Sequence, residues 1–192
     1  MEYEFIKHIA GTGLKTFVVA INWRELHFHN DMELLLVLDG SVSMDDGKQR
    51  YTLKKNDIFL SNKNAIHSLK RTHEDNLLMV IQFDPNLCKE YYPKIPRVRF
   101  SQNHIKKDSN GHYWEMLYRC MREIVSCYSK KHDGFAIEMM SILNHMLFCM
   151  LQNDRYTILD EKTAGAENRN MERLRRVIEF VRENYMYPIT LK

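Results

Sequence analysis

Three histidines and one glutamate form the most chemically informative pattern in the sequence. His27 and His29 are separated by one residue in a strand-like segment, so both imidazoles should leave the same face of a strand. Glu33 has the same parity, which an intervening turn could preserve or break, and His67 follows a later strand and loop. Three imidazoles and a carboxylate that converge would suit Zn, Fe, Mn or Ni. The alternatives are a metal-free polar ligand pocket, which we favour, and histidines that only satisfy structural hydrogen bonds.

Three further residues are candidates for a ligand pocket. Trp23 and Arg24 immediately precede the histidine pair, and Gln82 lies between apolar neighbours in a strand-like segment. A guanidinium can hold a hydroxyl-rich or anionic ligand through forked hydrogen bonds, and an indole can stack on a sugar face or a flat ring. The alternative is a solvent-facing arginine beside a core tryptophan.

The elements that must position these residues differ between the two halves of the chain. Up to about residue 104, short segments rich in Val, Ile, Leu, Phe and Tyr alternate with turn residues, and Asp46-Gly47 is typical of a hairpin. The expected strands are 15–21, 26–29, 33–38, 41–44, 49–53, 57–61 and 76–83. Many short strands at regular spacing indicate a sandwich or barrel.

From about residue 108 onward, apolar residues recur every three or four positions, which predicts helices. We expect helices at 112–131 and 135–151, which the short connection should make an antiparallel pair, and a third helix at 171–185. The polar stretch before the third helix is interpreted as a linker. The expected fold class is therefore mixed, with β-structure first and α-helices after it.

Composition excludes several classes of protein. The chain has 192 residues, of which 44% are hydrophobic and 28% charged, with a formal net charge of +3. So small an excess excludes a binder that relies on a generally basic surface. No window reaches the roughly 18 consecutive apolar residues of a membrane helix, and the first residues do not resemble a signal peptide. The four cysteines show no CxxC pairing and are interpreted as reduced thiols. We expect a cytoplasmic protein without membrane contact.

The histidine-rich segment resembles the first cupin motif, because His27, His29, Glu33 and Gly40 stand at its spacing. Ile21 stands where the motif has an upstream glycine. The offsets of the second cupin motif hold Asn56, Asn62, Asn64, His67 and Arg71. Asparagine tolerates the left-handed backbone region that glycine favours, whereas the arginine is a true departure. The resemblance implies a double-stranded β-helix, or jelly-roll barrel, in which the three histidines and the glutamate are the positions of a divalent metal's ligands.

The end of the chain resembles the opening of an AraC-type DNA-binding domain, in which a helix ending in Asn-Tyr is followed by a proline-containing turn and a Thr-Leu pair. The residues that carry this resemblance are Val177, Ile178, Val181, Asn184, Tyr185, Pro188, Ile189, Thr190 and Leu191. Thr190 would cap the next helix. Since the recognition helix would lie beyond this point, we expect the chain to be part of a longer regulator.

Together the two resemblances predict four regions: an effector-binding barrel at 1–104, connecting and dimerisation helices at 105–153, a linker at 154–168, and the start of a helix-turn-helix domain at 169–192. The residues expected at a dimer contact are Leu117, Met121, Ile124, Met140 and Met146. The same apolar side chains could instead form an intramolecular core.

The function expected from these patterns is ligand sensing and dimerisation in an AraC-type transcriptional regulator. The barrel would bind a small metabolite, by resemblance often a sugar, and the C-terminal domain would bind DNA as part of a homodimer. The expected pocket residues are Trp23, Arg24, His27, His29, Glu33, His67 and Gln82. We expect no catalysis. The alternatives are a metal-dependent cupin isomerase or dioxygenase that uses the His/His/Glu/His set, and a dimerisation module without an effector.

Overall fold

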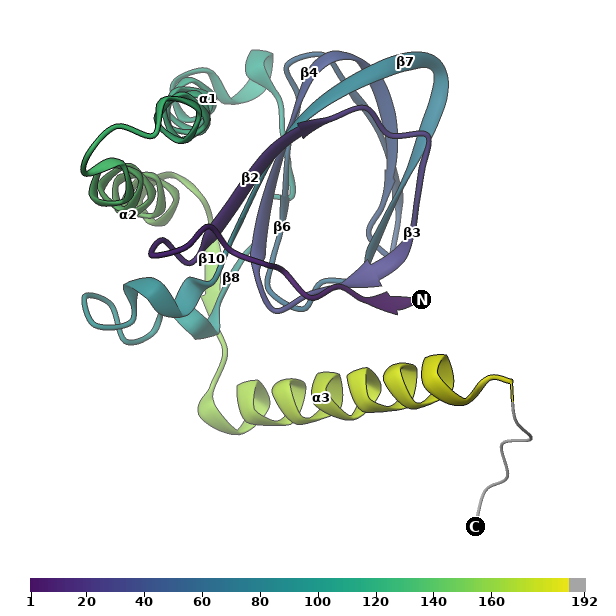
Figure 1. Ribbon diagram of the computed structural model, residues 1–192. Coiled ribbons are helices and arrows are strands. Elements are labelled where there is room, and N and C mark those ends of the chain that lie inside the picture. The colour runs from purple at the N-terminus through teal and green to yellow at the C-terminus, as the bar shows by residue number, and fades with distance from the viewer. Residues whose placement is uncertain (187–192) are drawn as a thin grey trace.

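The computed structural model describes residues 1–186, in which a strand-rich N-terminal region is followed by three long helices. The strands are β1 (Glu2–Tyr3), β2 (Leu14–Val19), β3 (Trp23–Phe28), β4 (Met32–Asp45), β5 (Arg50–Lys54), β6 (Ile58–Ser61), β7 (His67–Phe83), β8 (Val98–Phe100), β9 (His104–Ile105) and β10 (Tyr156–Ile158). The helices are α1 (Lys107–Lys130), α2 (Phe135–Asn153) and α3 (Glu161–Asn184), with short 3₁₀ turns η1 (Pro85–Cys88) and η2 (Ile95–Arg97). This confirms the predicted fold class (Figure 1).

Eight strands form one sheet that curls into the barrel (Figure 1). Its order is β1-β3-β7-β4-β6-β9, with β2 also paired to β7 and β5 to β4. The ladder between β4 and β7 is antiparallel and extends from Met32↔Phe83 to Asp45↔Ser68 with two register shifts. The predicted hairpin between β4 and β5 is present. The long ladder therefore holds the barrel together and fixes the register of its interior.

Two of the predicted strands, 33–38 and 41–44, are a single strand β4 because the chain passes through Gly40 without leaving the sheet. Gly40 has a φ of 66°, and a Cβ atom built there would overlap the carbonyl oxygen of Asp75. Only glycine fits such a position. Asn56 and Asn64 also have positive φ, 73° and 64°, which agrees with their substitution for the glycines of the cupin pattern.

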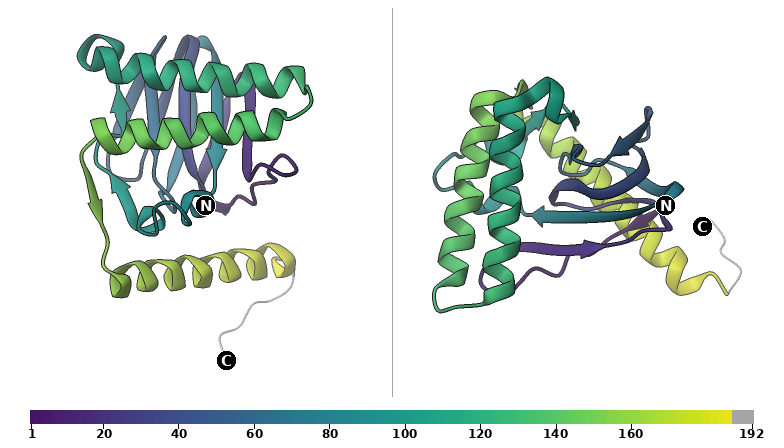
Figure 2. Two further views of the ribbon diagram at one scale, coloured as in Figure 1. Left: turned by 90° about the vertical axis from the view of Figure 1, so that its left-hand side faces the viewer. Right: turned by 90° about the horizontal axis from the view of Figure 1, so that it is seen from above.

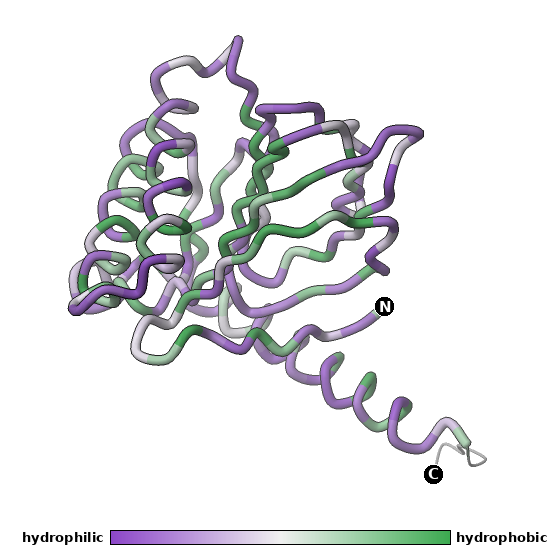
Figure 3. Tube along the Cα trace, turned by 45° about the horizontal axis from the view of Figure 1, so that its top comes forward, coloured by the Kyte–Doolittle hydropathy of each residue, from purple (hydrophilic) through white to green (hydrophobic). Residues whose placement is uncertain are grey.

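Alternation along β4 divides the buried side chains between two cores. Leu34 and Leu36 belong to a core that extends to the helices, whereas Leu35 and Val37 belong to a smaller core inside the barrel. Because both faces are covered, the strand is almost continuously apolar. Figure 3 shows the apolar residues concentrated in the strands and on the facing helices.

Helices α1 and α2 lie side by side across one face of the barrel, as predicted for an antiparallel pair (Figure 2). By length and composition, α2 could also cross a membrane. Core helices of soluble proteins pass the same test, and Met139, Leu143 and Met150 of α2 are fully buried within this chain. We therefore interpret α2 as a core helix.

Four of the five residues expected at a dimer contact are part of the core within this chain. Leu117, Met121, Ile124 and Met146 have no exposed surface, and Met140 is half-buried. The four fully buried side chains pack in the core between the helix pair and the sheet, whereas Met140 is partly exposed. The helical periodicity identified an apolar face correctly, but it could not distinguish a neighbouring sheet from a neighbouring subunit.

The polar stretch 154–168 is not a plain linker. Strand β10 pairs with β8, and α3 begins at Glu161 rather than at Met171. The side chain of Asp160 accepts a hydrogen bond from the Thr163 amide at 2.8 Å and caps the helix. The first turns of α3 contain few apolar residues, so the apolar periodicity of the sequence did not indicate that the helix begins there.

Helix α3 runs across the end of the barrel beside β1 (Figure 2). Of the residues that carried the AraC-type resemblance, Val177 and Val181 are exposed on this helix, and Tyr185 is exposed immediately after it. Pro188, Ile189, Thr190 and Leu191 lie outside the described residues.

Candidate ligand and metal site in the barrel

A row of polar side chains crosses four strands on the inner side of the barrel. The ladder registers pair Lys15 with Gln82, Gln82 with Glu33, and Glu33 with Ser61. Gln82 Nε2 donates to Glu33 Oε2 at 2.8 Å, and both side chains are almost completely buried. Further along the same inner faces, Leu35 and Val80 are apolar. The strands therefore supply a polar end and an apolar end to one interior.

The three histidines lie together beside this row. His27 of β3 pairs with His67 of β7, and their ring centroids are 4.2 Å apart. His29, just beyond β3, is 5.3 Å from His67 by the same measure. All three are at most 3% exposed. The side chains that the sequence pattern grouped are thus brought to one place.

Backbone contacts fix the orientation of each imidazole. Each Nδ1 faces a backbone carbonyl two residues away, at 2.8 Å for His27, 3.0 Å for His29 and 3.0 Å for His67. A carbonyl oxygen can only accept, so each Nδ1 carries a proton that it donates. The Nε2 atoms are then left to face the interior. Those of His29 and His67 are buried and have no hydrogen-bond partner among the described residues.

Glu33 supplies the negative charge of the cluster. Its carboxylate oxygens lie 3.4 Å from His29 Nε2 and 3.5 Å from His67 Nε2. Burial alone would raise the pKa of Glu33, but these two imidazoles hold the pKa of the carboxyl well below its usual range. Burial and the neighbouring His67 lower the pKa of His27 to about 4. Near neutral pH the cluster therefore combines an ionised carboxylate with a neutral His27.

These residues fit a divalent metal ion. The three histidines each offer one nitrogen, and the ligand atoms lie within 4.8 Å of one another. Metal-binding imidazoles typically donate their other N–H to a carbonyl or carboxylate, as all three do here. His27, His29 and His67 would hold the ion, with Glu33 as the carboxylate ligand. The unpartnered Nε2 atoms would then be satisfied.

A pocket of about 390 Å³ opens next to the histidine cluster. Five of the seven expected site residues line it: Trp23, Arg24, His27, Glu33 and Gln82. Trp23 is 63% exposed, as a rim residue would be, while His29 and His67 lie deeper, behind the lining. Five of the expected residues therefore surround one space, and the tryptophan is not part of the core.

Sequence reasoning missed several residues of this pocket. Glu4 reaches it because β1 pairs with β3, and it accepts a hydrogen bond from Arg24 at 2.9 Å, as does Glu2. Lys15 and Phe17 line it from β2. Period-two alternation along 15–21 could have placed Lys15 and Phe17 on one face, whereas no local signal identifies the partner of the N-terminal strand.

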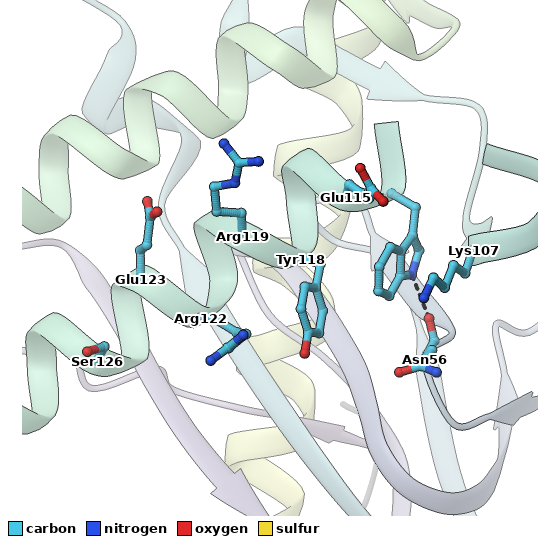
Figure 4. Close-up of a pocket in the computed structure, with 9 residues that line it drawn as sticks. Asn56, Lys107, Glu115, Tyr118, Arg119, Arg122, Glu123 and Ser126 are labelled. Atoms are coloured by element: carbon cyan, nitrogen blue, oxygen red, sulfur yellow. Dashed lines mark hydrogen bonds between the residues drawn. The ribbon is translucent and has the colours of Figure 1, made fainter. Parts of the chain in front are cut away.

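A larger hollow, of about 690 Å³, lies on α1 near the Asn56 turn (Figure 4). Trp114 and Tyr118 stack there with centroids 4.7 Å apart, and Trp114 Nε1 donates to the Asn56 carbonyl at 2.6 Å. Its charged side chains, such as Arg119 and Arg122, are exposed. It shares no lining residue with the barrel pocket. The barrel is the better candidate because its polar groups are buried and converge.

The fold is a β-barrel with a covering helix pair, and its site is a pocket lined by converging polar side chains. A family model described as the AraC-like ligand binding domain matches residues 20–147. The chain therefore belongs to this family, and the match includes Glu33 and Gln82 of the polar row, the histidine cluster and α1. No curated protein sequence matches.

Several solved structures are similar in part. A variant of Bacillus subtilis oxalate decarboxylase is 20% identical, with a TM-score of 0.34, and the match covers 38% of this chain and 22% of that one. A cupin-2 domain containing protein from Shewanella frigidimarina is 20% identical over 41% and 84% of the two chains, with a TM-score of 0.35. DMSP lyase DddQ from Ruegeria pomeroyi is 17% identical over 37% and 38%, also at 0.35. This chain thus spans about a fifth of the decarboxylase, and these are partial likenesses only.

Proposed function

We propose that this chain senses a small polar metabolite in the barrel and is the effector-binding region of an AraC-type transcriptional regulator. The single observation that carries the proposal is the polar row of Lys15, Gln82 and Glu33, which lines a pocket open to solvent. Buried polar groups are costly unless they are paired, so a row of them beside a pocket is typical of a binding site. Membership of the AraC-like ligand-binding family supports the same conclusion.

The side chains of the pocket favour a polyhydroxylated ligand. Lys15 and Gln82 offer donors, Glu33 offers acceptors, and the exposed Trp23 at the rim offers a flat apolar surface. Sugars and related polyols present hydroxyl groups that both donate and accept, together with C–H faces that stack on indoles. Arg24 is held by Glu2 and Glu4 and would have to exchange these partners to bind an anionic group.

Coupling to DNA binding requires that the ligand favour one arrangement of the chain over another. The N-terminal segment joins the pocket to α3, since Glu4 lines the pocket while Arg175 of α3 lies over the ring of Tyr3 at 5.7 Å. The exposed apolar face of α3 around Val177 and Val181 supports a following DNA-binding domain. We propose that the regulator acts in the cytoplasm as a homodimer, through surfaces other than the buried core of the helix pair.

Ligand binding can be tested with a thermal-shift screen of sugars, polyols and hydroxy acids, followed by calorimetry on each hit. A ligand at a hundredfold its Kd adds about 2.7 kcal/mol to stability. Q82L and K15M should weaken binding at least tenfold, while R122A, in the hollow on α1, should bind as the unsubstituted chain does. A hit that binds equally well to all three variants would overturn the assignment of the pocket.

A second candidate function rests on the three buried imidazoles, whose ligand nitrogens lie within 4.8 Å of one another beside the Glu33 carboxylate. We propose that the three histidines and Glu33 bind a divalent metal ion, which would supply a Lewis acid to a bound ligand. Such a centre would suit either a metal-assisted sensor or a metal-dependent isomerase or dioxygenase. Metal analysis of protein purified without chelator or histidine tag tests this. Near-stoichiometric metal that is lost in H27A and H67A is expected, whereas metal-free protein that still binds its ligand would leave only the sensor proposal.

A further inference from the structure

A second cluster of metal-ligating side chains lies at the turn between α1 and α2, formed by Cys127, His132 and Glu138. Glu138 Oε2 is 3.1 Å from Cys127 Sγ and 2.7 Å from His132 Nε2. The three ligand atoms lie within 4.8 Å of one another. The cluster shares no residue with the barrel site, so an inference from it is independent of the proposed function.

The donor atoms of this turn cluster suit zinc. Thiolate sulfur, imidazole nitrogen and carboxylate oxygen are its three usual protein ligands, at about 2.3, 2.0 and 2.0 Å. A tetrahedral ion with such bonds separates its ligand atoms by about 3.3–3.6 Å. The two separations that involve Glu138 are shorter than this by less than about 1 Å, and His132 and Glu138 have half-exposed side chains that can move outward.

The surroundings orient the cluster for binding. The Nδ1 of His132 donates to the Asp133 carbonyl at 2.8 Å, which leaves Nε2 directed at Glu138. Such an outer hydrogen bond is typical of metal-bound histidine. Cys127 is only 4% exposed and fixes the inner side of the cluster, whereas the other two side chains are open to solvent. A water molecule could therefore complete the coordination from outside.

We propose that Cys127, His132 and Glu138 bind one Zn²⁺ ion, with water as the fourth ligand, and thereby tie the end of α1 to the start of α2. Zinc takes the place of the thiol proton of Cys127 and of the proton that His132 shares with Glu138, and these protons pass to solvent. No electron is transferred. This revises the sequence-based interpretation of Cys127 as a reduced thiol.

Cobalt(II) substitution tests the proposal without interference from the barrel, because only a thiolate ligand gives the near-ultraviolet sulfur-to-cobalt charge-transfer band. Titration of the whole chain with Co²⁺ should give this band, which should be complete at one equivalent in H27A/H67A, and Zn²⁺ should remove it. The band should be absent in C127S and reduced at least tenfold at equal Co²⁺ in H132Q. It should persist in H27A/H67A, which lacks two barrel ligands.

C149S is the matched control. Cys149 is buried, and its Sγ lies 3.6 Å from His145 Nε2. Among the described residues, no third metal-ligating side chain is close enough to complete a site with this pair. Its substitution should leave the band unchanged. C127S changes a buried side chain and could misfold. H132Q changes a surface side chain and therefore provides a second, independent test. No band in the unsubstituted chain, or a band that survives both C127S and H132Q, would overturn the proposal.

Discussion

The two faces of the β4–β7 ladder share one backbone, but one face packs against helices and the other lines the interior of the barrel. On the face toward α1 and α2, Leu36, Met79 and Ile81 join one continuous apolar core. On the inner face, Leu35 and Val80 are apolar, and they are followed along the same strands by Glu33 and Gln82, which are hydrogen-bonded to each other. The helix pair seals the first face, whereas the second face opens into the pocket.

This difference shows how period-two alternation gives neighbouring residues of one strand different roles. A residue contributes to stability or to binding according to its parity, and neighbouring residues serve different cores. The helix-facing side can be dry because two helices cover it. The inner side tolerates buried polar groups because they pair with one another and because water reaches the pocket beside them.

A matched pair of leucines measures the contrast, and we expect the largest effect from it. L36A, in the helix-facing core, should lower the free energy of unfolding by about 3–5 kcal/mol, because the cavity left there cannot fill with water. L69A, which removes the same atoms from the wall of the pocket, should cost about 2 kcal/mol, since the new space joins the pocket. Equilibrium urea denaturation measures both. Equal losses would show that the inner side is as sealed as the outer one.

Q82L tests whether the polar row has its own stabilising role. Gln82 donates to the ionised Glu33, and hydrogen bonds to charged groups contribute about 1.5–3 kcal/mol. The variant should lose about that amount, and it should regain much of it when E33Q removes the charge that has lost its Gln82 donor. A double-mutant cycle gives the coupling between the two residues. Additive losses would contradict a direct interaction.

Asp154, at the end of α2, is a polar exception on the helical side. It is 8% exposed, and burial raises its pKa to about 6 from an ordinary 3.8. The folded chain therefore holds this proton more tightly than the unfolded chain, so ionisation costs stability as pH rises from about 4 to about 6. D154N should raise the free energy of unfolding by about 1–2 kcal/mol at pH 8, with a smaller gain toward pH 4. A gain that is independent of pH would contradict this explanation.

The smallest change in stability should come from W23A at the rim of the pocket. Trp23 is mostly exposed, and surface substitutions usually stay within about 0.5 kcal/mol. Affinity for a stacked ligand should nevertheless fall by about 0.5–1.5 kcal/mol, the value of a typical aromatic contact. Denaturation and calorimetry on one preparation separate the two effects. A large loss of stability would mean that the indole belongs to the core after all.

The sequence predicted those parts of the site that depend on local spacing. His27 and His29 share a face because they are two residues apart, and the cupin-like spacing correctly grouped them with Glu33 and His67. Trp23, Arg24 and Gln82 do line the pocket, although their role with a ligand stays a prediction.

What the sequence could not predict depends on pairing between distant segments. Glu4 reaches the pocket through the short parallel contact of β1 with β3, and Lys15 and Ser61 join the polar row only through the registers of β2 and β6. Met121 is buried because other elements of this chain cover its face of α1, and the sequence pattern does not identify those elements. Single-sequence patterns give the face of an element but not its neighbour.

The β4–β7 ladder also has a kinetic consequence. Its pairs begin at Asp45↔Ser68, close in sequence, and end near Glu33 and Gln82, which are separated by 49 residues. Contacts between distant residues form slowly because chain entropy is lost before they stabilise the fold. We expect the ladder to close progressively from the Asp45 end. In stopped-flow experiments Q82L should then accelerate unfolding and leave the folding rate nearly unchanged. The polar row would be completed only after the rest of the barrel has formed.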